Sequence, residues 1–418
     1  MHKKALSKGW IVVIAGFAVN LMLGTLYSWG VISSVLIDEL GWTATMTQIP
    51  YMVACATFAL SMVPGGRIQD KLGPKPILMA SATLAGIGFI FSGLFLTVTT
   101  LTIFFGIVFG AAMGIGYSTA TPAAVKWFDS SKRGVISGIV VSGFGLAPLY
   151  IAPLTTFLLK KYDIQTTFYF LGVSFFIGIM ILSRFISNPS EEYIAKQLKV
   201  KSLTDSISKS EKVQKNYTWR EVLKSKQFYM LWSMFCCGTF AGLLIIGQLS
   251  KIGLEQAGIQ NGFILAAIYA IFNASGRVGC GVLSDRIGRI QTLFMMFTLQ
   301  VIIYIFFAGF TSAIPLMFGV AVVGFTFGGM LTIFPATTGD YFGMKNFGMN
   351  YGMVITAWGV GGILGPLLGG IVRDITGTYG FSYTASAVLS LIGAMLAIAT
   401  KLSEKQLVNM KKVEVVKK

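Results

Sequence analysis

One motif occurs twice in the chain: residues 66–73 read GRIQDKLG and residues 281–288 read GVLSDRIG. Both match the pattern G-x-x-x-D-[KR]-x-G, and they lie 215 residues apart. A second marker repeats with almost the same offset, because the Trp-Phe and Gly of residues 127–134 are followed 214 residues later by the Tyr-Phe and Gly of residues 341–348. Two independent markers that share an offset predict an internal duplication.

Each copy of the repeat is rich in long apolar segments. The chain is 54% hydrophobic and 12% charged, with a mean hydropathy of +0.73, which excludes an ordinary soluble domain. A helix of roughly 20 apolar residues crosses the ~30 Å hydrocarbon core of a bilayer. Twelve such segments are predicted, at residues 10–36, 45–65, 76–98, 101–124, 135–159, 166–187, 227–250, 260–284, 290–310, 314–338, 349–372 and 382–402. The sequence therefore predicts an all-α membrane protein with twelve transmembrane helices.

The longest polar stretch divides these helices into two groups of six. The expected organisation is an N-terminal six-helix bundle at residues 1–187, a cytoplasmic central loop at 188–225, a C-terminal six-helix bundle at 226–402 and a cytoplasmic tail at 403–418. The central loop is rich in Lys and Ser, which is typical of a solvated tether. Binding of anionic lipid headgroups by its Lys residues is the alternative.

The basic residues indicate how the chain is oriented. Of 33 Lys and Arg residues, 28 fall in the N-terminus, the C-terminus and the loops predicted on their side of the membrane. The opposite side has Lys160, Lys161, Lys251 and Arg373, and Arg277 lies inside a hydrophobic segment. This asymmetry predicts that both termini are cytoplasmic. The net charge of +17 is thereby explained as a topology signal, and nucleic-acid binding is not expected.

The doubled motif resembles the signature of the major facilitator superfamily, and the resemblance covers the whole chain. It implies two six-helix bundles related by a pseudo-two-fold axis and transport by alternating access. Charged residues of the motif are predicted to act in gating, through bonds to a helix N-terminus or a nearby Arg. These residues are Asp70, Lys71, Asp285 and Arg286. The alternative is surface charge pairs with little effect.

Arg277 is the charged side chain in the middle of a hydrophobic segment. It precedes Asp285 by eight residues, which places it ~12 Å inward from the loop motif at a rise of ~1.5 Å per residue. A charge at that depth costs ~2.5 to 3.5 kcal/mol on insertion scales, and it normally faces a polar cavity or a partner. The hydrophobic segments offer no Asp or Glu as a permanent partner, and a guanidinium can give a carboxylate two parallel hydrogen bonds. Arg277 therefore predicts a site for a small organic anion, with snorkelling or a structural tie between helices as the alternatives.

The surroundings of Arg277 resemble the oxalate:formate antiporter family and its monocarboxylate-transporting relatives. The matching segments are Phe272-Asn273 before Arg277, Tyr27-Ser28-Trp29, Tyr117 ahead of Trp127-Phe128, and Phe334-Pro335 with Asp340. The resemblance implies that Tyr27 and Tyr117 hydrogen-bond the substrate while aromatic side chains wall the cavity. Asn273 is also expected to take part in substrate binding, and the side chains expected to line the cavity opposite Arg277 are Phe327, Leu331, Ile355 and Trp358. Taken without the resemblance, each of these side chains is explained as packing.

Two departures from the family patterns narrow the prediction. The oxalate exchanger has a second cation, a Lys, in its eleventh helix, where this chain has Trp358. One positive charge balances a monoanion and leaves the second charge of a dicarboxylate unpaired, so lactate, pyruvate or formate is expected in preference to oxalate. Proton-linked carriers of the animal type have an Asp one turn before the equivalent Arg, where this chain has Asn273. Because Asn does not take up a proton, the sequence favours anion exchange over return of the empty carrier.

Several other functions stay open. Oxalate:formate antiport and proton-linked monocarboxylate symport are the alternatives within transport, with a counter-anion or a proton as the coupled partner. A transporter-like nutrient sensor would keep the same cavity. A membrane enzyme is not expected, because the helices show no nucleophile, acid/base pair or metal cluster, and no cofactor is expected either. The resemblance favours a monomer in the cell membrane.

Overall fold

The computed structural model describes residues 2–128, 133–190, 193, 216–343 and 346–416. All regular structure in this part of the chain is helical. Twelve helical spans are long and apolar enough to cross a membrane, from Lys8–Leu40 to Gly380–Leu402. The predicted fold class is confirmed.

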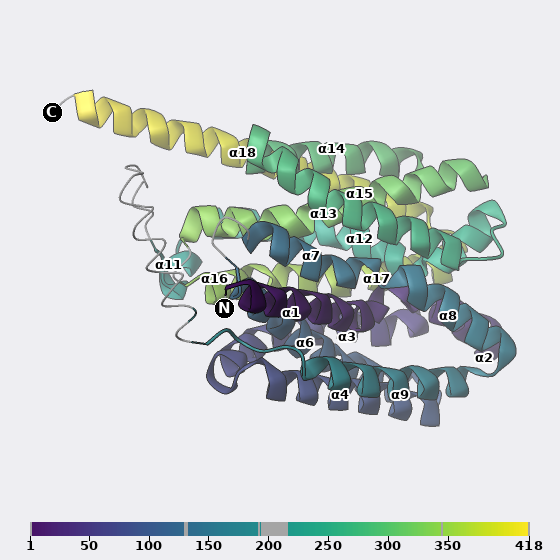
Figure 1. Cartoon of the computed structure of the whole chain (residues 1–418). Coiled ribbons are helices and arrows are strands. Elements are labelled where there is room, and N and C mark those ends of the chain that lie inside the picture. The colour runs from purple at the N-terminus through teal and green to yellow at the C-terminus, as the bar shows by residue number, and fades with distance from the viewer. Residues whose placement is uncertain (1, 129–132, 191–192, 194–215, 344–345, 417–418) are drawn as a thin grey trace.

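The first six spans form the N-terminal half of the molecule (Figure 1). Its helices are α1 (His2–Leu23), η1 (Gly24–Ser28), α2 (Trp29–Leu40), α3 (Ala44–Leu72), α4 (Pro74–Leu94), α5 (Val98–Leu101), η2 (Thr102–Phe109), α6 (Gly110–Val125), α7 (Arg133–Leu146), α8 (Pro148–Lys161) and α9 (Ile164–Ser183). Several helices share one span, so six spans are built from eleven helical elements.

The last six spans form the C-terminal half. Its helices are α12 (Lys226–Ala257), α13 (Phe263–Ile287), α14 (Arg289–Phe307), α15 (Ala313–Phe342), α16 (Phe347–Val354), α17 (Thr356–Thr376) and α18 (Gly380–Val416). A short helix, α11 (Trp219–Leu223), precedes them and begins with a capping box between Thr218 and Glu221. The region predicted as a central loop thus contains one turn of capped helix, and α18 continues into the predicted tail.

Three of the helix breaks lie in spans that pack against the other half. In the first span a 3₁₀ turn separates α1 from α2, and it approaches α7 so closely that a Cβ on Gly24 would lie 2.4 Å from the carbonyl oxygen of Phe144. Pro148 begins α8 because a ring without an N–H is tolerated in the first turn of a helix. Ile355 separates α16 from α17. Tyr27 and Ile355, which lie at two of these breaks, are both buried.

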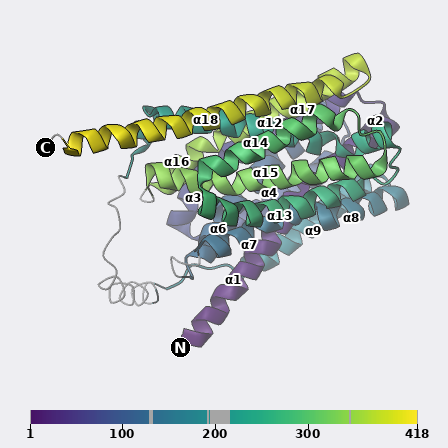
Figure 2. The same ribbon diagram turned by 90° about the horizontal axis from the view of Figure 1, so that it is seen from above.

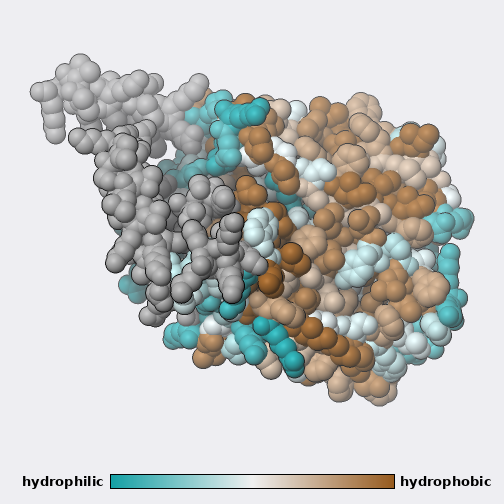
Figure 3. Space-filling view, viewed as in Figure 1, coloured by the Kyte–Doolittle hydropathy of each residue, from teal (hydrophilic) through white to brown (hydrophobic). Residues whose placement is uncertain are grey.

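The halves pack through two pairs of contacts that mirror each other. Helix α3 packs against α17, and α13 packs against α7 and α8; α12 also contacts α2. Both chain ends lie at the same end of the bundle, on the left in Figure 1, and Figure 2 shows α18 projecting there beyond the other helices. We call this the terminal end and the opposite one the distal end. Apolar residues cover most of the face in Figure 3, with hydrophilic residues gathered towards its two ends, as expected for helices surrounded by lipid.

Candidate functional site

A small cavity of about 20 Å³ lies between the halves beside Arg277. It is lined by Tyr27, Phe58, Tyr117, Phe144, Arg277, Leu331, Tyr351, Ile355 and Trp358. The volume is enough for little more than one water-sized group, so the protein is nearly closed around this point. Arg277 is the charged member of an otherwise neutral lining.

Arg277 projects from α13 and is 4% exposed. Its Nε donates to Asn273 Oδ1 at 2.9 Å, and its Nη1 donates to the carbonyl oxygen of Val141 at 3.0 Å. Asn273 lies one turn earlier on α13, whereas Val141 belongs to α7 in the other half. No carboxylate pairs with Arg277 among the described residues. The guanidinium is therefore held in place by neutral oxygens and keeps its full positive charge towards the cavity.

Two tyrosines of the N-terminal half face the guanidinium. Tyr27 and Tyr117 both lie within interaction range of Arg277. Phe144 holds both rings edge-on, with centroid distances of 5.2 Å to Tyr27 and 5.5 Å to Tyr117. This packing fixes the orientation of both phenols. Their hydroxyl groups can donate to an anion bound at Arg277 or accept from the guanidinium itself.

The absence of a side chain on Gly145 leaves room for the Arg277–Asn273 pair where α7 passes close to α13. A Cβ on Gly145 of α7 would lie 2.7 Å from Asn273 Oδ1 and 3.2 Å from Arg277 Nε. On α13 the next helix is equally near, since a Cβ on Gly328 of α15 would lie 2.0 Å from the carbonyl oxygen of Asn273. Glycine at these positions lets α13 pack tightly from two sides. The position of Arg277 is thus set by helix packing as well as by its own hydrogen bonds.

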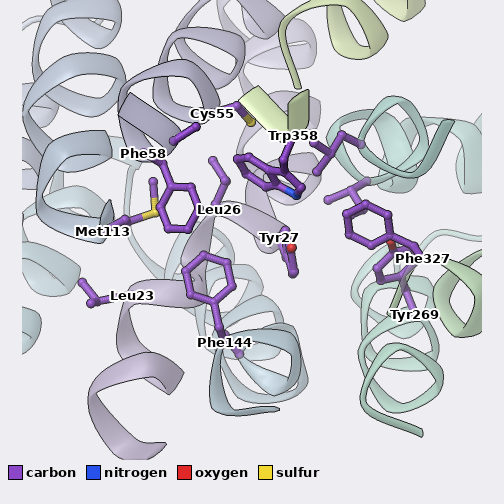
Figure 4. Close-up of a cluster of buried hydrophobic side chains, with 14 of the residues drawn as sticks. Leu23, Leu26, Tyr27, Cys55, Phe58, Met113, Phe144, Tyr269, Phe327 and Trp358 are labelled. Atoms are coloured by element: carbon purple, nitrogen blue, oxygen red, sulfur yellow. The ribbon is translucent and has the colours of Figure 1, made fainter. Parts of the chain in front are cut away.

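The remaining predicted site residues divide into two groups. Leu331, Ile355 and Trp358 line the cavity. Phe327 does not: it is fully buried behind Tyr27, with its ring centroid 6.2 Å from that of Tyr27. Figure 4 shows this aromatic cluster, with Trp358 and Phe58 side by side at a centroid distance of 5.0 Å.

Phe58, Phe144 and Tyr351 also line the cavity, although sequence reasoning did not select them. The duplication contains the signal that finds two of them. Three pairs of site residues are separated by the repeat offset: Phe58 and Asn273 by 215 residues, Tyr117 and Leu331 by 214, and Phe144 and Trp358 by 214. Equivalent positions of the two halves therefore meet around the cavity. The equivalent positions differ in polarity, since the counterpart of Asn273 is the aromatic Phe58; Asn273 does not itself line the cavity but accepts from Arg277. No comparable signal points to Tyr351.

The predicted gating residues lie at the terminal end. Asp285 pairs with Arg289, which also donates to Asp340 Oδ2 at 3.1 Å and to Ser284 Oγ at 2.6 Å. Arg286 is exposed, and no described residue forms an ion pair with it. In this copy of the motif, the cation that binds Asp285 is therefore Arg289, which directly follows the final glycine.

The first copy of the motif ends α3. Lys71 is exposed there, and the side chain of Asp70 lies outside what the structure describes.

The fold and the site define a class of membrane transporter. The Major Facilitator Superfamily model matches residues 12–314 and 264–414, and the chain belongs to that superfamily. The protein is accordingly a multi-pass membrane transporter and not an enzyme.

Three transporters are similar to this chain over most of their length. The oxalate:formate antiporter of Oxalobacter formigenes is 29% identical over 395 residues, which cover 94% of this chain and 91% of that protein. The uncharacterized MFS-type transporter YhjX of Escherichia coli is 27% identical over 358 residues, covering 85% and 86%. Monocarboxylate transporter 13 of Rattus norvegicus is 24% identical over 408 residues, covering 93% and 88%.

Proposed function

We propose that this protein is a secondary active transporter of small monocarboxylate anions, of the size of lactate, pyruvate or formate, that works by alternating access. The observation that carries the proposal is the buried guanidinium of Arg277, which faces a cavity and is bonded only to neutral oxygens among the described residues. A carboxylate can receive the parallel hydrogen bonds and the charge balance that this environment lacks. The relatives named for oxalate, formate and monocarboxylate transport support the same class of substrate.

The charge of the lining favours a monoanion. Arg277 is the ionised residue among the nine that line the cavity, and Trp358 is one of its neutral neighbours there. A dicarboxylate would bring a second negative charge into aromatic surroundings without a cation to meet it, and the desolvation penalty would oppose binding. Monocarboxylate transport is therefore preferred over oxalate transport.

The bonds of Arg277 favour anion exchange over return of the empty carrier. Its bond to the Val141 carbonyl oxygen crosses from one half to the other, so rearrangement of the halves around the site changes the environment of the guanidinium. The neighbouring Asn273 cannot take up or release a proton at physiological pH. A bound anion then provides the charge compensation during the transition. Alternating access in a monomer follows the superfamily architecture of two six-helix halves.

The distribution of Lys and Arg favours a cytoplasmic terminal end in the cell membrane. The motif residues Asp70, Lys71, Asp285 and Arg286 lie at this end, where the cytoplasmic gate would open. We include them in the proposal as gating residues, together with Arg289.

The test is counterflow of labelled lactate, pyruvate or formate into proteoliposomes. Uptake should be accelerated by internal unlabelled monocarboxylate and competed weakly by oxalate. Equal uptake by vesicles without internal anion would contradict exchange, and strong oxalate uptake would contradict the argument from a single charge. A protein that binds these anions but never moves them would be a sensor.

A variant tests whether the charge of the cavity selects the substrate. Trp358→Lys adds a second cation to the lining, so oxalate competition should strengthen by at least about tenfold while formate competition weakens. Arg184→Lys, which preserves charge at an exposed position after α9, is the control. An unchanged oxalate-to-formate ratio in Trp358→Lys would show that the lining does not set substrate charge.

A further inference from the structure

The indole N–H of Trp358 is a buried donor without an acceptor among the described residues. The side chain is 2% exposed and lines the cavity. Other tryptophans use this group: Trp29 donates to the Thr47 carbonyl oxygen at 3.0 Å, Trp127 to the Ser187 carbonyl oxygen at 2.7 Å and Trp232 to Thr356 Oγ1 at 2.9 Å. Buried polar groups are normally hydrogen-bonded, so an unused donor at a cavity wall suits a ligand.

The ring of Trp358 is held in a defined orientation. Phe58 packs against it at a centroid distance of 5.0 Å, and a Cβ on the adjacent Gly359 would lie 2.9 Å from Ala59 Cβ of the other half. Figure 4 shows the indole nitrogen on the side of the ring that faces Tyr27, and both residues line the cavity. The donor is therefore directed towards the space next to Arg277.

We infer that the Trp358 N–H is a specificity-determining contact that binds an oxygen substituent close to the substrate carboxylate. The inference rests on the proposed function, in which Arg277 holds that carboxylate. Because Trp358 and Arg277 line one cavity, the oxygen that Trp358 binds and the carboxylate must lie close together in the ligand. An oxygen on the carbon next to the carboxylate meets this condition. The ligand class is 2-oxo and 2-hydroxy monocarboxylates.

The chemistry of the indole also predicts which ligands are rejected. An indole N–H only donates, so it can donate to a keto or hydroxyl oxygen, whereas an ammonium group at the same position offers it no acceptor. Propionate has the carbon skeleton of pyruvate without the oxygen, and it leaves the donor unpaired. A site built to bond a substrate oxygen discriminates strongly against the analogue that lacks it.

The experiment measures equilibrium binding by calorimetry on detergent-purified full-length protein, which avoids leakage of undissociated acids through a bilayer. Pyruvate and lactate should bind the unmodified protein at least about tenfold more tightly than propionate, and alanine should not bind. Trp358→Phe keeps the ring but removes the N–H, so pyruvate should weaken to within about twofold of propionate, whose affinity stays unchanged. Trp127→Phe, which removes a bonded N–H remote from the cavity, should retain the full preference.

The outcomes separate this inference from the proposed function. Equal affinity for pyruvate and propionate in the unmodified protein, or an undiminished preference in Trp358→Phe, would overturn the role of Trp358 and leave monocarboxylate transport standing. The comparison of pyruvate with propionate on the unmodified protein can overturn the role of Trp358 even if Trp358→Phe does not fold. Failure of every monocarboxylate to bind would instead refute the proposed function itself.

Discussion

The distal and terminal ends of the interface between the halves are held together by different chemistry. At the distal end, Asp374 of α17 accepts from the backbone N–H groups of Ala44 and Thr45, both at 2.8 Å, at the start of α3. Lys251 of α12 pairs with Asp38 of α2 at 2.6 Å. All of these bonds cross between the halves. They combine a helix N-terminus with a carboxylate and a cation with an anion.

At the terminal end, the strongest described bonds stay within one half. Arg289 binds Asp285 and Asp340, and all three belong to the C-terminal half. A contact that does cross is Arg67 Nη2 to Met349 Sδ at 3.0 Å, and a thioether is a weak acceptor.

The residues that line the cavity also differ in how exposed they are. Tyr351 on α16, the cavity residue nearest the terminal end, is half-buried, whereas Tyr27 and Trp358 are 3% and 2% exposed. Among the described residues, the ion pair and the helix-cap bonds that cross between the halves lie at the distal end. Between the two ends, Arg277 links the halves through the Val141 carbonyl oxygen.

The largest effect is expected from removing this central link. Arg277→Lys keeps the charge but loses the planar fork that reaches Asn273, Val141 and a carboxylate together. Exchange of labelled monocarboxylate in proteoliposomes should fall by about 100-fold. Arg184→Lys, at an exposed position, should exchange at the normal rate. Near-normal exchange in Arg277→Lys would show that the buried guanidinium has only a structural role.

A smaller effect is expected where α7 approaches that link. A methyl group on Gly145 would displace the Asn273 amide and press on Arg277 Nε, so Gly145→Ala should weaken monocarboxylate binding by about 30-fold. Gly138→Ala lies on the same helix, where a Cβ would meet nothing within 4 Å, and it should bind normally. Titration calorimetry on both variants checks the difference. Equal binding would mean that the packing at Gly145 does not position the site.

The distal closure is tested at Asp374. Asp374→Ala removes the acceptor for two N–H groups of α3, so the distal-open form should become about tenfold more populated. The readout is the rate at which a thiol reagent modifies Ser33→Cys, a buried position whose hydroxyl bonds Thr47 in the same interface.

The control for Asp374 is a cap within one half. Asp163 accepts from the Thr166 N–H at 2.6 Å at the start of α9, and this bond lowers the pKa of Asp163, so the cap is charged at neutral pH. Asp163→Ala should leave the rate at Ser33→Cys unchanged. Equal acceleration in both variants would show that loss of any helix cap, and not of the link between halves, opens the distal end.

The smallest effect is expected at the Lys251–Asp38 pair. The Asp38 side chain is 52% exposed, and exposed ion pairs contribute little and are screened by salt. Asp38→Asn should raise the modification rate of Ser33→Cys by about twofold at low ionic strength and not at high salt. An effect as large as that of Asp374→Ala would place the main distal closure at the ion pair.

Much of the site could be predicted because burying a charge in a membrane restricts its possible uses. Arg277 was identified by its position in an apolar segment, and the structure brings Tyr27, Tyr117, Leu331, Ile355 and Trp358 to the same cavity. Phe327 is predicted to line the cavity but lies behind Tyr27. Helical spacing predicts which face of a helix a ring occupies but not how deeply the ring packs. The motif does not show that Arg289 is the cation that pairs with Asp285. Arg286 and Arg289 are both close to Asp285 in the sequence, and the turn after Ile287 decides which of them reaches it.

The twelve hydrophobic segments, the duplication and the central cation follow from the sequence alone, because they depend on hydropathy, spacing and charge along the chain. The tertiary structure adds that the Val141 carbonyl oxygen and Gly145 meet Arg277, that equivalent positions of the repeats line one cavity, and that Asp374 joins the halves at the distal end. These features arise from contacts between residues more than 100 positions apart in the chain. Backbone carbonyls and glycines carry no side-chain signal for such contacts, so helix packing had to place them.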